Sequence, residues 1–591
     1  MKTDIPGFSA AESVRLSCEN PGTWRFDATR ETAPGGAEIL RVRLSAPEPA
    51  SPPRFDVSLV APQPGVRWIW NSALDVPVLP PEWGGGMTSQ IASQSPLLVL
   101  GGSDGRARLS VACSEATRRV DWRYGLYEED AFVHVRLGFF RTAEAPRSAY
   151  ETAIRLDGAA CDWADAARAA SEWICARPEY APMPVPDAAF EPLYSTWYGY
   201  HQDVHDKDLE REFAEAAALG MKTLIVDDGW QTEDTARGYA FCGDWEPARS
   251  RFPDFRAHVD RVHALGLKYM IWYSVPFVGE RSRALKRFEG KFLYHKDNMG
   301  AWVLDPRFPE VREFLASTYE RAVREWNLDG LKLDFIDSFV APDPDPAAAD
   351  GWAGRDMKSV PDAVLALMQD VRRRLEAARP GILVEFRQSY MGPAIRSFGN
   401  MIRAGDVPGD PLRNRARVAR LRLTSGTTAV HSDMLEWNPR ETPQQAAQQI
   451  LSVLFSAIQY SMRLDRLPAA HKRMMRHWIA WTAAHRGALL RGSFAPRRPE
   501  LGYPLLEGAD EAERVVAVYD PGFVAAVPAD GRETWIANAT DAPSLPLDLA
   551  AAPAAAEAFD TFGDPVPATA PGAGLRRVAV PPSGLLRLRY S

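Results

Sequence analysis

Apolar and polar residues alternate most clearly in the middle of the chain, at residues 329–337 (Asp-Gly-Leu-Lys-Leu-Asp-Phe-Ile-Asp). In a strand, successive side chains point to opposite faces, so Lys332 and Asp334 would share one face. Helical patterns precede and follow this stretch, at Val311 to Trp326 and Val360 to Ala378. A strand between helices is typically parallel and covered on both faces, so we expect its charged residues at the carboxyl end, where sites form.

The same alternation of strand and helix repeats from Leu193 onward. The expected strands are Leu193 to Trp197, Thr223 to Val226, Lys268 to Ile271, Gly330 to Leu333, Leu383 to Phe386, Met401 to Ala404, Thr428 to His431 and Ile458 to Met462. The expected helices are Lys207 to Leu219, Phe255 to Leu265, Val311 to Trp326, Val360 to Ala378, Leu412 to Thr424, Gln444 to Ser456 and Ala469 to His485, with a very short one near Pro393 to Phe398. Eight strands with helices between them predict a (β/α)8 TIM barrel.

Shorter β-type segments lie on both sides of this region. Residues 1–180 alternate between strands such as Phe55 to Val60 and Pro/Gly-rich turns, which predicts an N-terminal antiparallel β-sandwich. A helix at Ala164 to Ala176 and a proline-spaced linker end it. β-type segments resume near Arg491 and predict a small antiparallel C-terminal sandwich. We therefore expect three domains, at residues 1–180, 181–490 and 491–591.

Composition and charge exclude several classes of partner. The net charge is −8 with acidic and basic residues mixed along the chain, so no nucleic-acid partner is expected. No apolar run reaches membrane-spanning length, and the first residues do not resemble a secretory leader. The five cysteines form no CxxC pair. We expect free thiols and a cytoplasmic protein without a membrane partner.

Charged residues follow the expected barrel strands. They are Asp227, Asp228, Lys332, Asp334, Glu385, Arg387, Arg403, Asp406, His431 and Asp433. The aromatic residues near them are Trp197, Trp230 and Trp272. Because strand ends meet at one rim of a barrel, these groups predict a pocket rich in hydrogen-bonding charge for a polyhydroxylated substrate.

Two of these carboxyl groups suit glycoside hydrolysis, which needs a pair on either side of the anomeric carbon. Asp334 and Asp406 follow strands four and six and can meet across the barrel opening. Lys332 would favour the ionised form of Asp334, whereas Asp406 needs a raised pKa to donate a proton. The alternative is that these aspartates cap the following helices. For His431 and Asp433 the structural and the functional interpretation are equally good.

The motifs of this region resemble glycoside hydrolase family 36 and its clan relative family 27. Leu-Ile-Val-Asp227-Asp228-Gly-Trp230 is similar to the family's second-strand signature, and Gly-Leu-Lys332-Leu-Asp334 to the segment that holds its nucleophile. Residues 403–410, Arg-Ala-Gly-Asp-Val-Pro-Gly-Asp, are similar to the acid/base segment, and Trp197-Tyr198 to the aromatic end of strand one.

The resemblance implies roles for these residues. Asp334 would be the nucleophile and Asp406 the acid/base. The residues implied in substrate binding are Trp197, Asp227, Asp228, Trp230, Trp272, Lys332, Glu385, Arg387, Arg403 and Asp410. Two segments depart from the family pattern: Trp272-Tyr-Ser-Val-Pro after strand three and Glu385-Phe-Arg387-Gln388-Ser389 at strand five. By the same resemblance these segments contact the 2-position of the sugar and the leaving group, so the departures concern the choice of substrate and not the two catalytic carboxyl groups.

These observations predict a retaining exo-glycosidase that acts on terminal α-linked galactose of an oligosaccharide or glycoconjugate, without a cofactor or metal. The alternatives are an α-glucoside or α-N-acetylgalactosaminide substrate or, in a different class, a metal-dependent sugar isomerase or hydrolase. A catalytically silent carbohydrate-binding protein is a third reading. The resemblance is compatible with a homo-oligomer.

Overall fold

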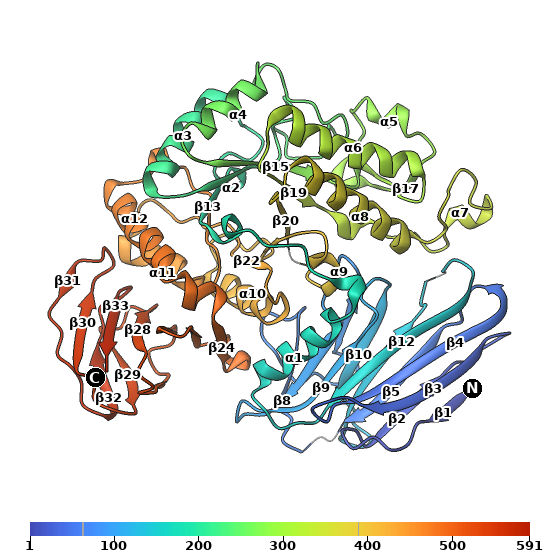
Figure 1. Ribbon diagram of the computed structural model, residues 1–591, viewed down its shortest axis with the longest axis horizontal. Helices are drawn as coiled ribbons and strands as arrows, with labels where there is room; N and C mark the ends of the chain where they lie inside the picture. Colours follow the sequence, from blue (N-terminus) through green and yellow to red (C-terminus); the bar gives the residue numbers. More distant parts are fainter. Residues whose placement is uncertain (62–63, 143, 388, 591) are drawn as a thin grey trace.

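The computed structural model describes residues 1–61, 64–142, 144–387 and 389–590, which form a barrel with a β domain at each end of the chain (Figure 1). The blue N-terminal domain and the red C-terminal domain both lie below the green and olive barrel in this view. This order confirms the fold predicted from the sequence.

The N-terminal domain is an antiparallel sandwich of two six-stranded sheets. One sheet has the order β1 (Lys2–Asp4), β2 (Ser13–Ser17), β5 (Phe55–Ala61), β11 (Val133–Phe139), β10 (Val120–Leu126) and β7 (Gly86–Ser89). The other has the order β3 (Arg25–Thr32), β4 (Glu38–Ala50), β12 (Arg147–Asp157), β9 (Ala107–Cys113), β8 (Leu97–Gly101) and β6 (Trp68–Asn71). Buried and partly exposed residues alternate strictly along β5, as expected for a strand with one face in the core.

The barrel is a single sheet in which every neighbouring pair of strands is parallel. Its strands are β13 (Leu193–Ser195), β14 (Thr223–Val226), β15 (Lys268–Ser274), β19 (Gly330–Asp334), β20 (Leu383–Arg387), β21 (Met401–Arg403), β22 (Ala429–His431) and β23 (Gln459–Tyr460). β23 pairs with β13, and a parallel bridge between His431 and Ala457 links the remaining two edges. The strand ends therefore meet at one rim.

Helices cover the outside of the barrel. They are α3 (Asp206–Leu219), α4 (Phe255–His263), α6 (Pro309–Trp326), α8 (Val360–Ala378), α9 (Pro393–Arg396), α10 (Pro411–Thr424), α11 (Pro443–Ser452) and α12 (Ala469–Ala484). All eight lie where the helical periodicity predicts them, within a few residues. The first strand is shorter than expected, because the chain enters the short helix α2 (Trp197–Tyr200) at Trp197.

Three further strands and two short helices interrupt the connections on the carboxyl side of the barrel. The strands β16 (Phe277–Gly279), β17 (Phe292–Lys296) and β18 (Ala301–Leu304) form a small antiparallel sheet, and the helices are α5 (Ala284–Arg287) and α7 (Pro346–Ala349). The sequence analysis did not predict these elements, because segments of three to five residues are too short to show a period.

The C-terminal domain contains a seven-stranded and a three-stranded sheet. The larger has the order β24 (Ser493–Arg497), β25 (Leu505–Ala509), β26 (Glu513–Val518), β28 (Glu533–Asn538), β33 (Leu585–Arg589), β30 (Ala555–Phe559) and β31 (Pro565–Val566). The smaller contains β27 (Ala525–Val527), β29 (Ser544–Leu549) and β32 (Gly574–Ala579). Most of their pairs are antiparallel, but β26 with β28 and β27 with β29 are parallel.

One hydrophobic core connects the three domains. It contains Trp70 of the N-terminal domain, strand residues such as Leu331 and Leu333 together with the helix residues of the barrel, and Trp535 of the C-terminal domain. Trp70 Nε1 donates to the hydroxyl of Tyr503 at 3.1 Å, and helix α1 (Trp163–Cys175) packs between the N-terminal sheet and α10 (Figure 1). Buried aromatic side chains contribute several kcal/mol each to such contacts. The N-terminal domain is therefore fixed relative to the barrel opening.

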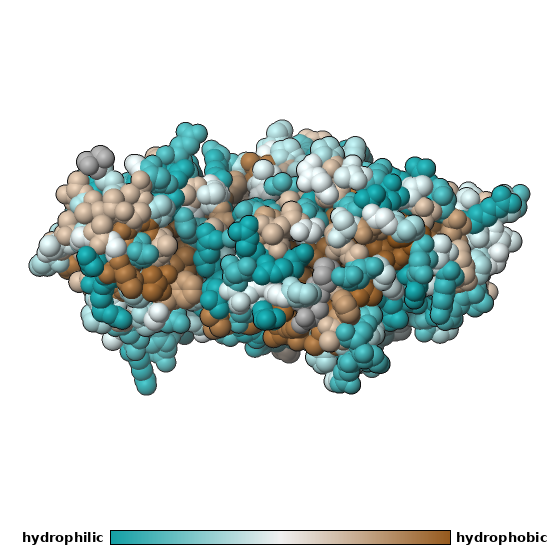
Figure 2. All heavy atoms as spheres, turned by 90° about the horizontal axis from the view of Figure 1, so that it is seen from below, coloured by the Kyte–Doolittle hydropathy of each residue, from teal (hydrophilic) through white to brown (hydrophobic). Residues whose placement is uncertain are grey.

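The outer surface carries scattered apolar residues. Figure 2 shows that, on the face seen from below, hydrophobic residues lie between hydrophilic ones and form no continuous band. Within the described residues, no helix is long and apolar enough to cross a membrane.

Candidate active site

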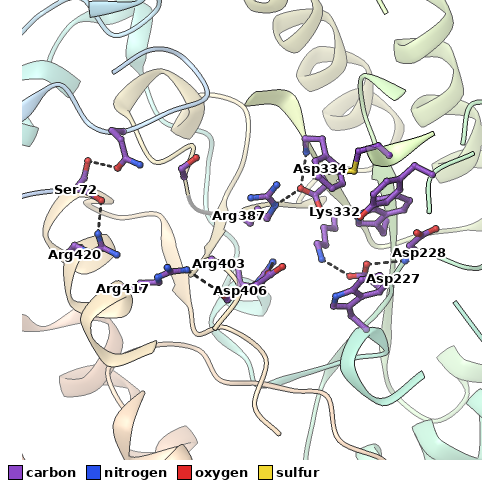
Figure 3. Close-up of a pocket in the computed structure, with 18 of the residues that line it drawn as sticks. Ser72, Asp227, Asp228, Lys332, Asp334, Arg387, Arg403, Asp406, Arg417 and Arg420 are labelled. Carbon is purple, nitrogen blue, oxygen red and sulfur yellow. Dashed lines mark hydrogen bonds and ion pairs between the residues drawn. The ribbon is translucent and has the colours of Figure 1, made fainter. Parts of the chain in front are cut away.

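A cavity of about 440 Å³ lies at the carboxyl ends of the barrel strands (Figure 3). Its lining residues are Ser72, Ala73, Gln94, Trp197, Asp227, Asp228, Tyr239, Trp272, Met299, Lys332, Asp334, Phe335, Arg387, Ser389, Arg403, Gly405, Asp406, Arg417 and Arg420. The volume lies within the range typical of small-ligand pockets. Nine of the residues predicted from strand ends therefore meet in one place: Trp197, Asp227, Asp228, Trp272, Lys332, Asp334, Arg387, Arg403 and Asp406.

Asp334, the last residue of β19, is almost completely buried and surrounded by donors. Its Oδ1 accepts hydrogen bonds from Arg387 Nε at 2.6 Å and from the Tyr390 hydroxyl at 3.0 Å, and its Oδ2 accepts one from Trp272 Nε1 at 3.1 Å. Burial alone would raise the pKa of this carboxyl group, but the positive charges of Arg387 and Lys332 hold that pKa well below its usual range. Asp334 is therefore a carboxylate at every ordinary pH.

The backbone turns sharply directly after Asp334. Phe335 has φ +64°, a left-handed conformation that is unfavourable for a residue with a side chain. The turn ends the strand, and the Phe335 ring lines the cavity. Asp334 does not cap the helical turn that follows, at Ile336–Ser338. The alternative role considered for Asp334, a helix cap, is thus absent.

Lys332 connects β19 with the end of β14. Its Nζ donates to Asp227 Oδ2 at 2.5 Å, and both groups are buried. The neighbouring Asp228 accepts hydrogen bonds from Gln202 and Gln231, each at 2.6 Å, while burial raises the pKa of Asp228 to about 7. This end of the cavity offers one ammonium group and two carboxyl groups to a ligand.

Asp406 lies in the loop after β21 and, unlike Asp334, is about half exposed, with 53% of its side chain accessible. Arg403 Nη2 donates to it at 2.8 Å. Desolvation by the surrounding residues would raise its pKa, but Arg403 first, then Lys332 and Arg387, hold the pKa of Asp406 below its usual range. The raised pKa that a resting proton donor needs is therefore not found at Asp406.

Arg403 also pairs with Asp433, a buried residue that follows β22 and does not line the cavity. Arg403 Nη1 donates to Asp433 Oδ1 at 2.5 Å, and Tyr198 donates its hydroxyl proton to Asp433 Oδ2 at 2.9 Å. Burial raises the pKa of Asp433 to about 6. The Nε2 of His431 contacts the carbonyl of Ala189, and burial lowers the pKa of this imidazole to about 4, so the ring is neutral. Both residues support the site and do not line the cavity.

Three of the residues predicted to bind substrate do not reach the cavity. Trp230 is fully buried and donates its Nε1 to the carbonyl of Trp272. Glu385 is buried behind the cavity, where it accepts a hydrogen bond from Gln459 at 2.5 Å. Asp410 caps α10, accepting a hydrogen bond from the backbone of Arg413. The predicted contacts of these three side chains with substrate are therefore not supported by their positions.

The sequence analysis missed the contribution of the N-terminal domain. Ser72, Ala73 and Gln94 line the cavity, and the Ser72 hydroxyl donates to Gln94 Oε1 at 3.0 Å. They come from loops with no recognisable motif, so no signal in the sequence could have found them. Trp83, in another loop of the N-terminal domain, is exposed and does not line the cavity.

Arg417 and Arg420 were also missed, although they follow a readable pattern. They are spaced three apart on α10, so they share one helix face. The fifth-strand segment that departs from the family pattern contributes Arg387 and Ser389 to the cavity lining. Gln388 of this segment lies outside the described residues. Within the described residues, no group of three or more His, Cys, Asp or Glu side chains is arranged to hold a metal ion.

Comparison with known proteins agrees with this architecture. The Melibiase family model matches residues 189–492, which is more than half of the chain. A probable α-galactosidase G from Emericella nidulans is 29% identical over 171 residues, which cover 26% of this chain and 23% of that protein. The 1,4-α-glucan branching enzyme GlgB from Mycobacterium ulcerans is 25% identical over 267 residues, which cover 42% of this chain and 34% of that enzyme. The chain thus spans about a quarter to a third of the length of these curated relatives.

Solved structures resemble the chain over nearly its full length. The α-galactosidase from Lactobacillus brevis has a TM-score of 0.64 at 13% identity, covering 100% of this chain and 85% of its own. A variant of a family 36 α-galactosidase from Geobacillus stearothermophilus, in complex with stachyose, has a TM-score of 0.61 at 13% identity, covering 98% and 87%. At these identities the likeness concerns the fold. The family model decides the classification, and the chain belongs to the Melibiase family, which confirms the resemblance to glycoside hydrolase family 36.

Proposed function

We propose that the chain is a retaining exo-glycosidase that removes terminal α-linked galactose from oligosaccharides or glycoconjugates. The observation that carries the proposal is the pair Asp334 and Asp406 in one cavity of the barrel. One is a buried carboxyl group whose pKa is held well below its usual range, and the other is half exposed. Membership of the Melibiase family and the printed names of the α-galactosidase relatives support galactose as the sugar.

In the proposed reaction, one oxygen of Asp334 attacks the anomeric carbon while the bond to the leaving oxygen breaks. Asp406 gives its proton to that oxygen, which leaves as an alcohol. In the second step Asp406 takes a proton from water, the water oxygen attacks the anomeric carbon, and Asp334 is released as a carboxylate. Atoms and charges balance without a cofactor.

The lowered pKa of Asp406 fits this role if the bound substrate raises it. A ligand above Asp406 would exclude water from its exposed half, and desolvation raises the pKa of a carboxyl group. Asp334 needs no such change, because the lowered pKa already keeps it ionised.

The sugar would bind at the end of the cavity formed by Lys332, Asp227 and Asp228. Their ammonium and carboxyl groups can make charge-assisted hydrogen bonds to sugar hydroxyls. Trp197 and Trp272 supply flat apolar surface nearby. The stachyose named in the Geobacillus stearothermophilus structure is a candidate substrate for this chain as well.

An α-glucoside is the second candidate sugar. The observation that favours it is the similarity to the 1,4-α-glucan branching enzyme over 267 residues. An α-N-acetylgalactosaminide would use the same two carboxyl groups. A metal-dependent isomerase or hydrolase would need ligands that have not been identified among the described residues, and loss of activity with a chelator would reveal it.

The compartment is also a proposal. All five cysteines are free thiols in the structure. Free thiols, two of them only partly buried, are typical of a reducing compartment such as the cytoplasm.

The test is hydrolysis of 4-nitrophenyl α-galactoside, α-glucoside and α-N-acetylgalactosaminide by the wild type, Asp334→Ala and, as a control, Asp260→Ala. Asp260 is an exposed residue of the barrel helix α4, where it pairs with Arg256, and it does not line the cavity. We expect the Asp334 variant to lose at least about a thousandfold in kcat/KM and the control to keep its activity. Azide added to the Asp334 variant should yield a β-glycosyl azide. Full activity of Asp334→Ala would refute the proposed nucleophile.

A further inference from the structure

The two ends of the cavity differ in charge (Figure 3). Asp227, Asp228, Lys332 and Asp334 lie together at one end, where the sugar is proposed to bind. At the other end the charged lining residues are Arg387, Arg403, Arg417 and Arg420, with Asp406 as the one carboxylate drawn among them. This second end would hold the leaving group.

Two of the four arginines are paired within the site. Arg387 donates to Asp334, and Arg403 donates to Asp406 and Asp433. Their charges are therefore balanced by carboxylates that belong to the reaction centre.

The other two share a single carboxylate with a third arginine. Asp75, in a loop of the N-terminal domain, pairs with Arg420 at 2.5 Å, Arg413 at 3.0 Å and Arg417 at 3.2 Å. Asp75 is the one carboxylate within 4.0 Å of these three guanidinium groups in the described part of the chain. One negative charge thus faces three positive charges, which leaves an excess of two.

The two arginines of this group that line the cavity are largely buried. The Arg420 side chain is 2% exposed and its Nε has no hydrogen-bond partner among the described residues; the Arg417 side chain is 18% exposed. Uncompensated charge is costly to bury, so a site that contains it is prepared for an anion. Arg413 is different, because half of its side chain is exposed and it does not line the cavity.

Arg417 is also next to the proposed proton donor. Its Nη1 donates to the backbone carbonyl of Asp406 at 3.2 Å. A substituent of the leaving group close to the glycosidic oxygen would therefore approach this guanidinium group. Ser72, which accepts a hydrogen bond from Arg420 and donates one to Gln94, adds neutral hydrogen-bonding groups at the same end of the cavity.

From this arrangement we propose that the leaving group of the natural substrate carries an anionic substituent, a phosphate, sulfate or carboxylate, which binds to Arg417 and Arg420. The inference rests on the glycosidase function proposed above and adds the class of leaving group. The guanidinium plane matches such groups by paired hydrogen bonds.

An anion at this position would also help the chemistry. Nearby cations hold the pKa of Asp406 below its usual range. A bound negative charge offsets those cations and favours the protonated form of Asp406, which is the form that donates to the leaving oxygen.

The experiment compares α-galactosides of three three-carbon alcohols that differ in their charged group. Galactosylglycerol is neutral, α-galactosylglycerol 3-phosphate carries a phosphate, and α-galactosylglycerate carries a carboxylate. Galactose release measures kcat/KM for each. We expect the charged substrates to be cleaved with at least about tenfold higher kcat/KM than the neutral one, and we expect this ratio to fall as salt rises to about 0.5 M.

Variants assign the preference to the cluster. Arg417→Gln should reduce the ratio of charged to neutral kcat/KM to about one, whereas Arg417→Lys should retain part of it. Arg413→Gln is the matched control, because it removes an arginine that also contacts Asp75 but lies outside the cavity, and it should retain the ratio.

The outcomes separate the two proposals. If the wild type cleaves no α-galactoside in this set or with the 4-nitrophenyl group, the proposed function fails. If it cleaves the neutral substrate as well as the charged ones, the function stands and the anionic leaving group is refuted. If the preference for charged substrates persists in Arg417→Gln and is lost in Arg413→Gln, the assignment of the anion to Arg417 is also refuted. The relevant charge would then lie outside the cavity.

Discussion

Arg387 Nε donates to Asp334 Oδ1 at 2.6 Å, so a cation of β20 contacts the proposed nucleophile of β19 directly. The contact follows from the register of the barrel. Lys332 of β19 pairs with Glu385 of β20, and two residues further toward the rim the strands reach Asp334 and Arg387. The guanidinium group also lies over the rings of Phe335 and Tyr390, at 5.1 and 5.6 Å. The fifth-strand segment that departs from the family pattern therefore acts on the nucleophile itself.

Replacing Arg387 by Gln should move the acidic limb of the pH profile upward. In the proposed mechanism Asp334 attacks as a carboxylate, so activity falls when the pH drops through its pKa. The Arg387 charge lowers that pKa, and removing this charge should raise the pKa. The measurement is kcat/KM for a cleaved 4-nitrophenyl α-glycoside from about pH 3 to 8.

Arg379→Gln is the control for this experiment. Arg379 pairs with Asp329, which precedes β19 at the opposite end of the barrel from the cavity. The Arg379→Gln variant should keep the acidic limb of the pH profile where the wild type has it, even if the variant is less stable. An unchanged limb in Arg387→Gln would show that Lys332, Trp272 and Tyr390 suffice to hold the Asp334 charge.

Replacing Asp406 by Asn should affect substrates according to their leaving group. An alkyl leaving group needs the proton, so its kcat/KM should fall about 10²- to 10⁴-fold, whereas a dinitrophenyl leaving group should lose much less in the glycosylation step. The wild type should also show a pH effect. Since the pKa of Asp406 is lowered in the free enzyme, kcat/KM for a neutral alkyl glycoside should fall as the pH rises through the acidic range. An equal loss for both leaving groups would exclude Asp406 as the acid.

The barrel could be predicted because each strand and helix carries its own period. Val360 to Ala378, for example, is predicted and observed as one helix. The site could be predicted as far as strand ends determine it, because parallel strands bring Asp227, Lys332 and Arg403 to one rim whatever their separation in sequence.

The rest of the site depends on contacts that no local pattern encodes. Trp230 follows Asp228 in the family motif, but Gly229 has φ +123° and packs against the Gln202 backbone, where a Cβ would come within 2.6 Å. This turn directs Trp230 into the core instead of the cavity. The position of Ser72 in the cavity lining depends on how the N-terminal domain docks onto α10, which is a tertiary contact.

Glu385→Gln should stabilise the protein increasingly as the pH rises. Burial raises the pKa of Glu385 to about 7, from an ordinary value near 4.5. Between these values the folded state keeps the proton and the unfolded state loses it, so wild-type stability falls with rising pH by about 1.4 kcal/mol per unit. The neutral Gln removes this loss. Its advantage over the wild type should grow by up to about 3 kcal/mol from pH 4.5 to 7 and stay constant above.

Urea unfolding of both proteins at pH 4.5, 6 and 7.5 measures this difference. Glu385 Oε1 and Gln459 Oε1 both lack hydrogen-bond partners among the described residues, so an amide at position 385 can donate to Gln459. A stability difference that does not change with pH would show that Glu385 titrates with an ordinary pKa.

The last prediction concerns the contact that holds the N-terminal wall of the cavity. Asp75 is 23% exposed and binds three arginines of α10, while Arg420 Nη1 donates to the carbonyl of Ser72 at 2.9 Å. Asp75→Asn leaves Arg420, which is 2% exposed, without a carboxylate partner. Breaking one side of a largely buried ion pair costs about 3 kcal/mol. The loop that carries Ser72 should also lose its fixed position, which raises KM.

Arg413→Gln is the comparison variant, because it removes the half-exposed partner of the same carboxylate. Exposed ion pairs contribute less than about 1 kcal/mol, so its stability and KM should stay close to those of the wild type. Urea unfolding and KM for the best substrate measure both effects. If Asp75→Asn is as stable as Arg413→Gln and binds substrate equally well, the docking of the N-terminal domain rests on its apolar contacts around Trp70, and the arginines of α10 are left to act on the ligand alone.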